Sequence, residues 1–166
     1  MKRMIPLFLI IICLSGCYVK KDSAKECISD EIYPSAVPCF MIEADIPSQA
    51  VLTASCHDGC CAMFTHPDFE IFQEVFRAES LEDAFVHLTG KKQDELSVVQ
   101  IRRSPHNEYR FSFTAASEDG SVGGIGTLIY DGTHGYSMTI LCPLEKQSQY
   151  EDTFSGMLSS IVLNPV

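Results

Sequence analysis

The fold is decided by residues 109–143, YRFSFTAASEDGSVGGIGTLIYDGTHGYSMTILCP. Aromatic residues alternate with polar ones at 109–113, and apolar residues alternate again at 138–142, which is the period of β-strands. The pairs Asp119-Gly120 and Asp131-Gly132 mark reversals between the apolar segments. Strands joined by such short turns are antiparallel neighbours in one sheet.

Further strands are predicted before this stretch and within it, and the sheet is expected to have about six strands. Their segments are 40–47, 51–55, 62–64, 96–102 and 125–130. The glycines that precede the last of these segments lack the strand-to-helix context and the Lys-Ser/Thr ending of a phosphate-binding loop. They predict a bulged or tightly packed start of a strand.

Two regions have the apolar spacing of helices. Asp68 is expected to cap a helix that carries Phe69, Phe72 and Phe76 on one face. Ser80 gives a second cap signal, and its helix is expected to end at Gly90. The pattern leaves open whether residues 69–89 form one bent helix or two.

The last helix is predicted from an apolar stripe near the end of the chain. Its members are Tyr150, Phe154, Met157, Leu158 and Ile161. A stripe of this kind packs on a sheet, so the predicted fold class is α+β, an antiparallel sheet flanked by helices.

The N-terminus has the pattern of a bacterial lipoprotein signal. Lys2 and Arg3 precede an apolar run, which closes in Leu14-Ser15-Gly16-Cys17 and resembles a lipobox. As a helix, residues 4–16 would span ~20 Å, which is short of the ~30 Å hydrocarbon core of a membrane. We therefore expect residues 1–16 to be removed and Cys17 to be lipidated.

The mature chain is expected to consist of a tether and one domain. Residues 17–38 hold the lipidated cysteine and a polar linker, and residues 39–166 have about the modal length of one domain. Tyr18 follows the lipidated cysteine where an aspartate would favour retention at the inner membrane. The prediction is an outer-membrane lipoprotein whose domain faces the periplasm.

The charge balance excludes several classes of partner. The chain has 12 basic and 22 acidic residues, a net charge of −10 with histidines neutral. Loss of Lys2 and Arg3 leaves 10 against 22, or −12. Such acidity argues against binding to nucleic acid and against adhesion to anionic head groups. The membrane is then contacted through the lipid anchor alone, and the expected partner is another envelope protein.

Six of the eight cysteines remain after Cys13 is lost with the leader and Cys17 is acylated. An even number in an oxidising compartment predicts up to three disulfides. The six are Cys27, Cys39, Cys56, Cys60, Cys61 and Cys142. If Asp58-Gly59 forms a two-residue hairpin loop, Cys56 faces Cys61 as the closer pair, and a Cys56–Cys61 bridge is feasible.

The alternative is a thiol-redox or metal-handling role for the hairpin. Cys56, His57, Cys60 and Cys61 supply four soft or borderline ligands. Structural zinc sites, however, usually draw ligand pairs from separate segments. A thioredoxin-like motif needs two residues between its cysteines at the start of a helix, whereas three residues separate Cys56 from Cys60. The disulfide is the favoured prediction.

No catalytic motif is present in the sequence. The histidines are isolated, and they are His57, His66, His87, His106 and His134. None lies in a metalloprotease motif, and no serine lies in a Gly-x-Ser-x-Gly setting. A turn cap explains His66 beside Asp68 more simply than acid–base chemistry. We expect a protein that is not an enzyme and has no cofactor or resident metal.

The order of these parts resembles the DcrB-type lipoproteins, which belong with the PsbP-like proteins. The resemblance covers residues 40–164 and rests on the lipobox, the tether, Ile46-Pro47, the helix at 69–89, the run 128–143 and the helix at 147–160. It implies an α/β/α sandwich without a cofactor, and non-catalytic roles in assembly, envelope maintenance or partner binding. It transfers no catalytic residues. The six further cysteines depart from the DcrB pattern.

Overall fold

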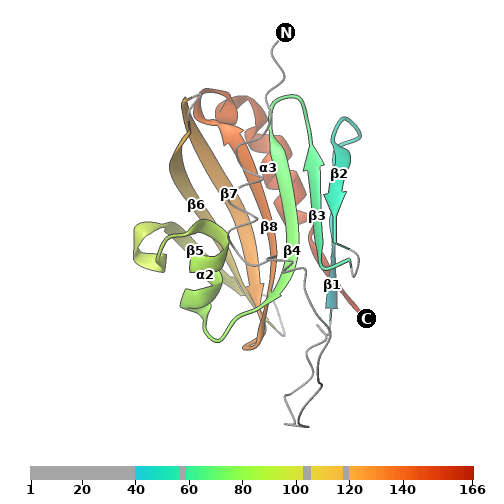
Figure 1. The fold of residues 1–166 in the computed structure, drawn as a ribbon, viewed down its shortest axis with the longest axis vertical. Helices are drawn as coiled ribbons and strands as arrows, with labels where there is room; N and C mark the ends of the chain where they lie inside the picture. Colours follow the sequence, from blue (N-terminus) through green and yellow to red (C-terminus); the bar gives the residue numbers. More distant parts are fainter. Residues whose placement is uncertain (1–39, 57–58, 103–105, 118–119) are drawn as a thin grey trace, which may run out of the picture. The chain divides into compact units, whose positions relative to one another are not determined.

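The structure is a computed structural model that describes residues 40–56, 59–102, 106–117 and 120–166 (Figure 1). The predicted leader, the lipidated Cys17 and the tether lie outside these residues. Cys27, Cys39 and His57 lie outside them as well. The predicted division at residues 16 and 38 stays a prediction.

The predicted antiparallel sheet is present and has seven strands. In spatial order they are β2 (Val51–Ser55), β3 (Cys61–Thr65), β4 (Glu70–Arg77), β8 (His134–Pro143), β7 (Gly120–Tyr130), β6 (Asn107–Ser117) and β5 (Ser97–Arg102). Every neighbouring pair is antiparallel. A second sheet pairs β1 (Phe40–Glu43) with β9 (Val162–Pro165). The α+β class is confirmed, and the sheet predicted to have about six strands has seven in the described part of the chain.

Two α-helices lie on opposite sides of the large sheet, α2 (Leu81–Thr89) and α3 (Glu151–Ser159) (Figure 1). Two 3-10 helices, η1 (Gln93–Glu95) and η2 (Leu144–Tyr150), precede β5 and α3. The cap signals of α2 are confirmed, because the backbone N–H of Asp83 donates to Ser80 Oγ (3.1 Å) and Gly90 ends the helix with φ of 69°. Within the described residues, no helix is long and apolar enough to cross a membrane.

The helix predicted from Phe69 to Phe76 is wrong. Residues 70–77 form β4, which lies inside the sheet between β3 and β8. Ile71 points to the α3 side and Phe72 to the α2 side, and both are buried. A strand that is buried on both faces does not alternate between apolar and polar residues. The spacing of its phenylalanines can then match that of a helix by chance.

The last helix is shorter than predicted. Tyr150 ends η2, α3 covers Glu151–Ser159, and the chain then turns into β9. Phe154, Met157 and Leu158 are buried as the apolar stripe requires. β9 was not predicted, because a strand of four residues with proline at its end is defined mainly by its pairing with β1.

The α2 side of the sheet is closed by aromatic packing. Phe85 of α2 has no exposed surface and meets Tyr109 and Phe111 of β6 edge to face, at ring-centroid distances of 6.0 and 5.7 Å. Gly126 of β7 lies beneath Phe111, where an added Cβ would collide with the ring and with a backbone carbonyl. The glycine-rich part of β7 is therefore tightly packed, and its register with β6 runs without a bulge.

The α3 side is only half covered. Its apolar cluster joins α3 to β4, β7, β8 and the small sheet, with Tyr136, Met138 and Ile140 fully buried along β8. No residue of β5 or β6 belongs to this cluster. Val99 of β5 is 61% exposed on this side.

Candidate functional site

An open groove with a cavity volume of about 530 Å³ lies where α3 leaves the sheet uncovered. Its floor includes Val99, Arg110 and Ile125 from β5, β6 and β7. Gln147 of η2 and Glu151 of α3 form the wall of the groove. Apolar surface flanked by a few polar groups is typical of binding sites.

Arg110 on the groove floor binds α3, which forms part of the groove wall. Its Nε donates to Oε1 of Glu108 (3.0 Å), and its Nη2 donates to the backbone carbonyl of Leu158 near the end of α3 (2.9 Å). Glu108 is only 1% exposed, and the charge of Arg110 stabilises its buried carboxylate. The contact ties β6 to α3 and compensates the arginine charge inside the groove.

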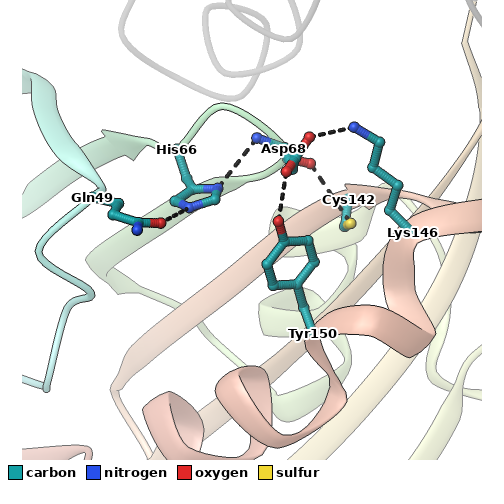
Figure 2. A network of polar contacts seen from close by, with 6 residues as sticks. All are labelled: Gln49, His66, Asp68, Cys142, Lys146 and Tyr150. Carbon is teal, nitrogen blue, oxygen red and sulfur yellow. Dashed lines mark hydrogen bonds and ion pairs between the residues drawn. The ribbon is translucent and has the colours of Figure 1, made fainter.

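Asp68 fixes η2, the element that carries Gln147, and Figure 2 shows its contacts. Lys146 Nζ donates to one carboxylate oxygen of Asp68, and the hydroxyl of Tyr150 donates to the other at 2.5 Å. Lys146 and Tyr150 belong to η2, whereas Asp68 lies in the turn between β3 and β4. The three residues therefore fix η2 against the sheet. We call them the Asp68 clamp.

His66 supports the turn that carries Asp68. The backbone N–H of Asp68 donates to His66 Nδ1 (3.2 Å), and Nε2 on the other side of the ring contacts Gln49 Oε1 (3.0 Å) (Figure 2). The ring stacks on Phe69 at a centroid distance of 4.1 Å. The expected turn cap is confirmed, with the imidazole as the capping group.

The electrostatics of the clamp oppose a catalytic role. Hydrogen bonds from Lys146 and then Tyr150 hold the pKa of Asp68 below its usual value, and the bond to Asp68 raises the pKa values of both partners. Burial raises the pKa of the Cys142 thiol. A general base or a nucleophile at neutral pH needs the reverse directions, a raised carboxylate pKa or a lowered lysine or thiol pKa. The arrangement is that of a structural ion pair.

The cysteines of the hairpin occupy the ends of β2 and β3. Cys56 and Cys61 are at disulfide distance, with Cα atoms 5.2 Å apart. Cys60 is half-buried beside them. The described residues contain no group of three or more histidine, cysteine or acidic side chains that could hold a metal ion.

Cys142 requires a correction, because it was counted among the possible disulfide cysteines. It is a free thiol, 1% exposed, whose Sγ lies 3.7 Å from the backbone carbonyl of Asp68. Its position on β8 points it into the core beneath α3. A disulfide at this position would need a second cysteine inside that core.

The other histidines that the structure describes, His87, His106 and His134, do not converge on one site. His87 pairs with Glu74 on the α2 side at 3.0 Å, and His134 lies beside Asp131 in the turn before β8. His106 packs its ring against Phe40. These separate settings fit the isolation of the histidines in the sequence.

Sequence reasoning missed the groove and both of its anchors. Asp68 and Lys146 are 78 residues apart, and no local spacing connects them. One signal was available in β5, where Val98, Val99 and Ile101 place apolar side chains on both faces of a strand at the edge of the sheet. Such a strand carries more apolar surface than one covered face requires.

Comparison of the sequence finds no matching protein family and no matching curated protein. Solved structures do share the fold. The solution structure of cyanobacterial PsbP (CyanoP) from Synechocystis sp. PCC 6803 matches with a TM-score of 0.54 and 9% identity, over 81% of this chain and 98% of that one. LpqN, involved in cell envelope biogenesis of Mycobacterium tuberculosis, matches with a TM-score of 0.51 and 8% identity, over 75% and 83%. The fold is PsbP-like.

Proposed function

We propose that this chain is an exported lipoprotein whose domain binds another protein of the cell envelope without catalysing a reaction. The observation that carries the proposal is the groove beside α3. The groove has exposed apolar surface at Val99, and its wall consists of α3 and η2. Arg110 fixes α3, and the Asp68 clamp fixes η2. A preformed site of this kind binds without first ordering its own elements.

The site chemistry supports a binding role over an enzymatic one. Arg110 in the groove is paired with Glu108, and Asp68 and Lys146 beside η2 are paired with each other, whereas Glu151 on the groove wall is exposed. The hydrogen bonds of Arg110 and of Asp68 position α3 and η2. The envelope role of LpqN, stated in its name, is in keeping with the proposal but belongs to a protein that shares the fold at 8% identity. Membership of the DcrB type is part of the proposal, on the order of elements and the lipobox.

Lipid anchoring is tested directly. Cells that express the full chain are labelled with a palmitate analogue, and their membranes are separated by density. We expect label on the wild type, none on Cys17→Ser, and recovery of the labelled protein in the outer membrane. Label on Cys17→Ser, or recovery in the soluble periplasmic fraction, would refute the anchor.

Partner binding is tested by photocrosslinking in the native cell. A photoreactive amino acid replaces Val99 in the groove of the full chain, and the matched control replaces Val86, a 43% exposed valine on α2. We expect one discrete crosslinked envelope protein from position 99 and none from position 86. Equal crosslinking from both positions, or none from either, would contradict the proposal.

A further inference from the structure

We propose that the outer edge of β5, together with the groove, accepts an extended cationic segment of the partner protein, which adds to the sheet as a further strand. This inference rests on the proposed function and specifies the partner chemistry. Strand addition supplies affinity through backbone hydrogen bonds and specificity through alternate side chains.

The first argument is the state of the two sheet edges. Exposed edges are usually protected by charges, prolines or bulges, because an open ladder pairs with other chains. The β2 edge has a register shift between Leu52 and Ala54. The β5 edge has no such break, since its six residues pair with β6 in continuous register. Residues 97–101, SVVQI, carry neither charge nor proline, and the one charged residue of β5 is Arg102 at its end.

The second argument is the surface beside this edge. Val99 and Ile101 lie on the α3 side of β5 and are 61% and 41% exposed. An added strand would place every second side chain next to them, on the side where the groove opens. Long side chains of the added strand could enter the groove next to Val99.

The third argument is charge, which selects the occupant. The charge of Arg110 is compensated by Glu108, whereas Glu151 on the groove wall and Asp152 after it are exposed. The whole chain has a net charge of −10, so a second copy would bring the same acidic rim and be repelled. Lysine or arginine in the added segment would face Glu151 with complementary charge.

The test uses the full chain in detergent and a fluorescent peptide of alternating valine and lysine, long enough to pair with all six residues of β5. Binding is followed by fluorescence anisotropy at low and moderate salt. Two comparison peptides are used, one with glutamate in place of lysine and one with a central valine replaced by proline. We expect the cationic peptide to bind, the acidic one not to bind, and proline to weaken binding about tenfold.

Variants of the protein locate the binding. Val99→Lys is expected to weaken the cationic peptide about tenfold, and its matched control Val86→Lys is expected to have little effect. Glu151→Gln should weaken it several-fold at low salt, whereas Glu79→Gln, another exposed glutamate, should not. Equal binding of all three peptides, equal losses in variant and control, or no binding at all would overturn the inference. A crosslink at position 99 in the cell would then still support the proposed function.

Discussion

Strands β5 and β6 present two contrasting faces, and the contrast is visible in adjacent residues. Val98 packs with the cluster beneath α2, whereas Val99 on the other face is 61% exposed. On the α2 side, Phe111 and Phe113 of β6 contribute to that cluster. On the α3 side, the same strand presents Arg110 and Ser112 to an open groove. One face is closed by the core, and the other is open and carries the groove for which we propose a binding role.

The difference follows from dimensions. A helix is about 10 Å wide and strands lie about 4.8 Å apart, so one helix covers only two or three of the seven strands. On the α3 side, the helix packs with residues of β4, β7 and β8, and the small β1–β9 sheet joins the same cluster. This apolar cluster includes no residue of β5 or β6, and β6 is linked to α3 through Arg110. On the α2 side, α2 and the aromatic side chains of β6 cover β5 and β6.

The largest expected effect is on the closed face. Phe85→Ala removes a fully buried ring between Tyr109 and Phe111 and leaves a cavity, so it should lower the free energy of unfolding by about 3–5 kcal/mol. Urea unfolding of the full chain measures this. The matched control is Val86→Ala, its exposed neighbour on α2, which should change stability by less than about 0.5 kcal/mol. Similar losses for the two variants would mean that α2 does not seal this face.

An intermediate effect is expected at the boundary between the groove and the core. Arg110→Gln removes the charged partner of the buried Glu108 and the bond to Leu158, so we expect a loss of about 2 kcal/mol by urea unfolding. The double variant Arg110→Gln with Glu108→Gln should recover part of this loss, because the buried carboxylate that Arg110 contacts is then a neutral amide. If the double variant is less stable than the sum of the single losses predicts, Arg110 does not act through Glu108.

The sequence predicted the meander and α2 because each of their signals is local. Turn residues separate β5 to β8, and Ser80 and Gly90 bound α2. It failed at 70–77, because the position of β4 between β3 and β8 depends on pairing with residues some 60 places later in the chain. The pattern of a strand buried on both faces does not distinguish it from a helix.

The candidate site was less predictable than the fold. Its anchors join Asp68 to Lys146 and Arg110 to Leu158, contacts between residues 48 or more places apart. The prediction that Asp68 caps a helix was wrong, because residues 70–77 form β4 and the Asp68 carboxylate instead accepts from Lys146 and Tyr150 of η2. The groove exists because α3 does not cover β5. The number of strands that α3 covers depends on tertiary packing, so no local residue spacing in the sequence predicts it.

A smaller, pH-dependent effect is expected at the Asp68 clamp. The folded pKa of Asp68 lies below its ordinary value of 3.8, chiefly because Lys146 and Tyr150 donate to its carboxylate. The unfolded state then binds more protons, so the contribution of the clamp is fully present above about pH 4 and is lost as the pH falls through the folded pKa. Asp68→Asn should lower the urea midpoint at pH 7 and flatten its fall below pH 4.

The control for this prediction is Glu79→Gln, which removes one exposed carboxylate elsewhere on the surface. Below pH 4, the urea midpoint of Glu79→Gln should fall more steeply with decreasing pH than that of Asp68→Asn. Identical pH profiles for the two variants would show that Asp68 contributes only as a general surface charge. Peptide binding by Asp68→Asn at pH 7 then reports whether the clamp also sets the position of the groove wall.

The smallest effects separate the two faces most sharply, because they compare one side chain at neighbouring positions. Val98→Ala removes apolar surface from the α2 cluster and should cost about 1 kcal/mol, whereas Val99→Ala should stay within about 0.5 kcal/mol in urea unfolding. In peptide binding the order should reverse, with Val99→Ala the weaker binder. If Val99→Ala destabilises the chain as much as Val98→Ala does, both faces of β5 serve the core, and the groove is not free for a partner.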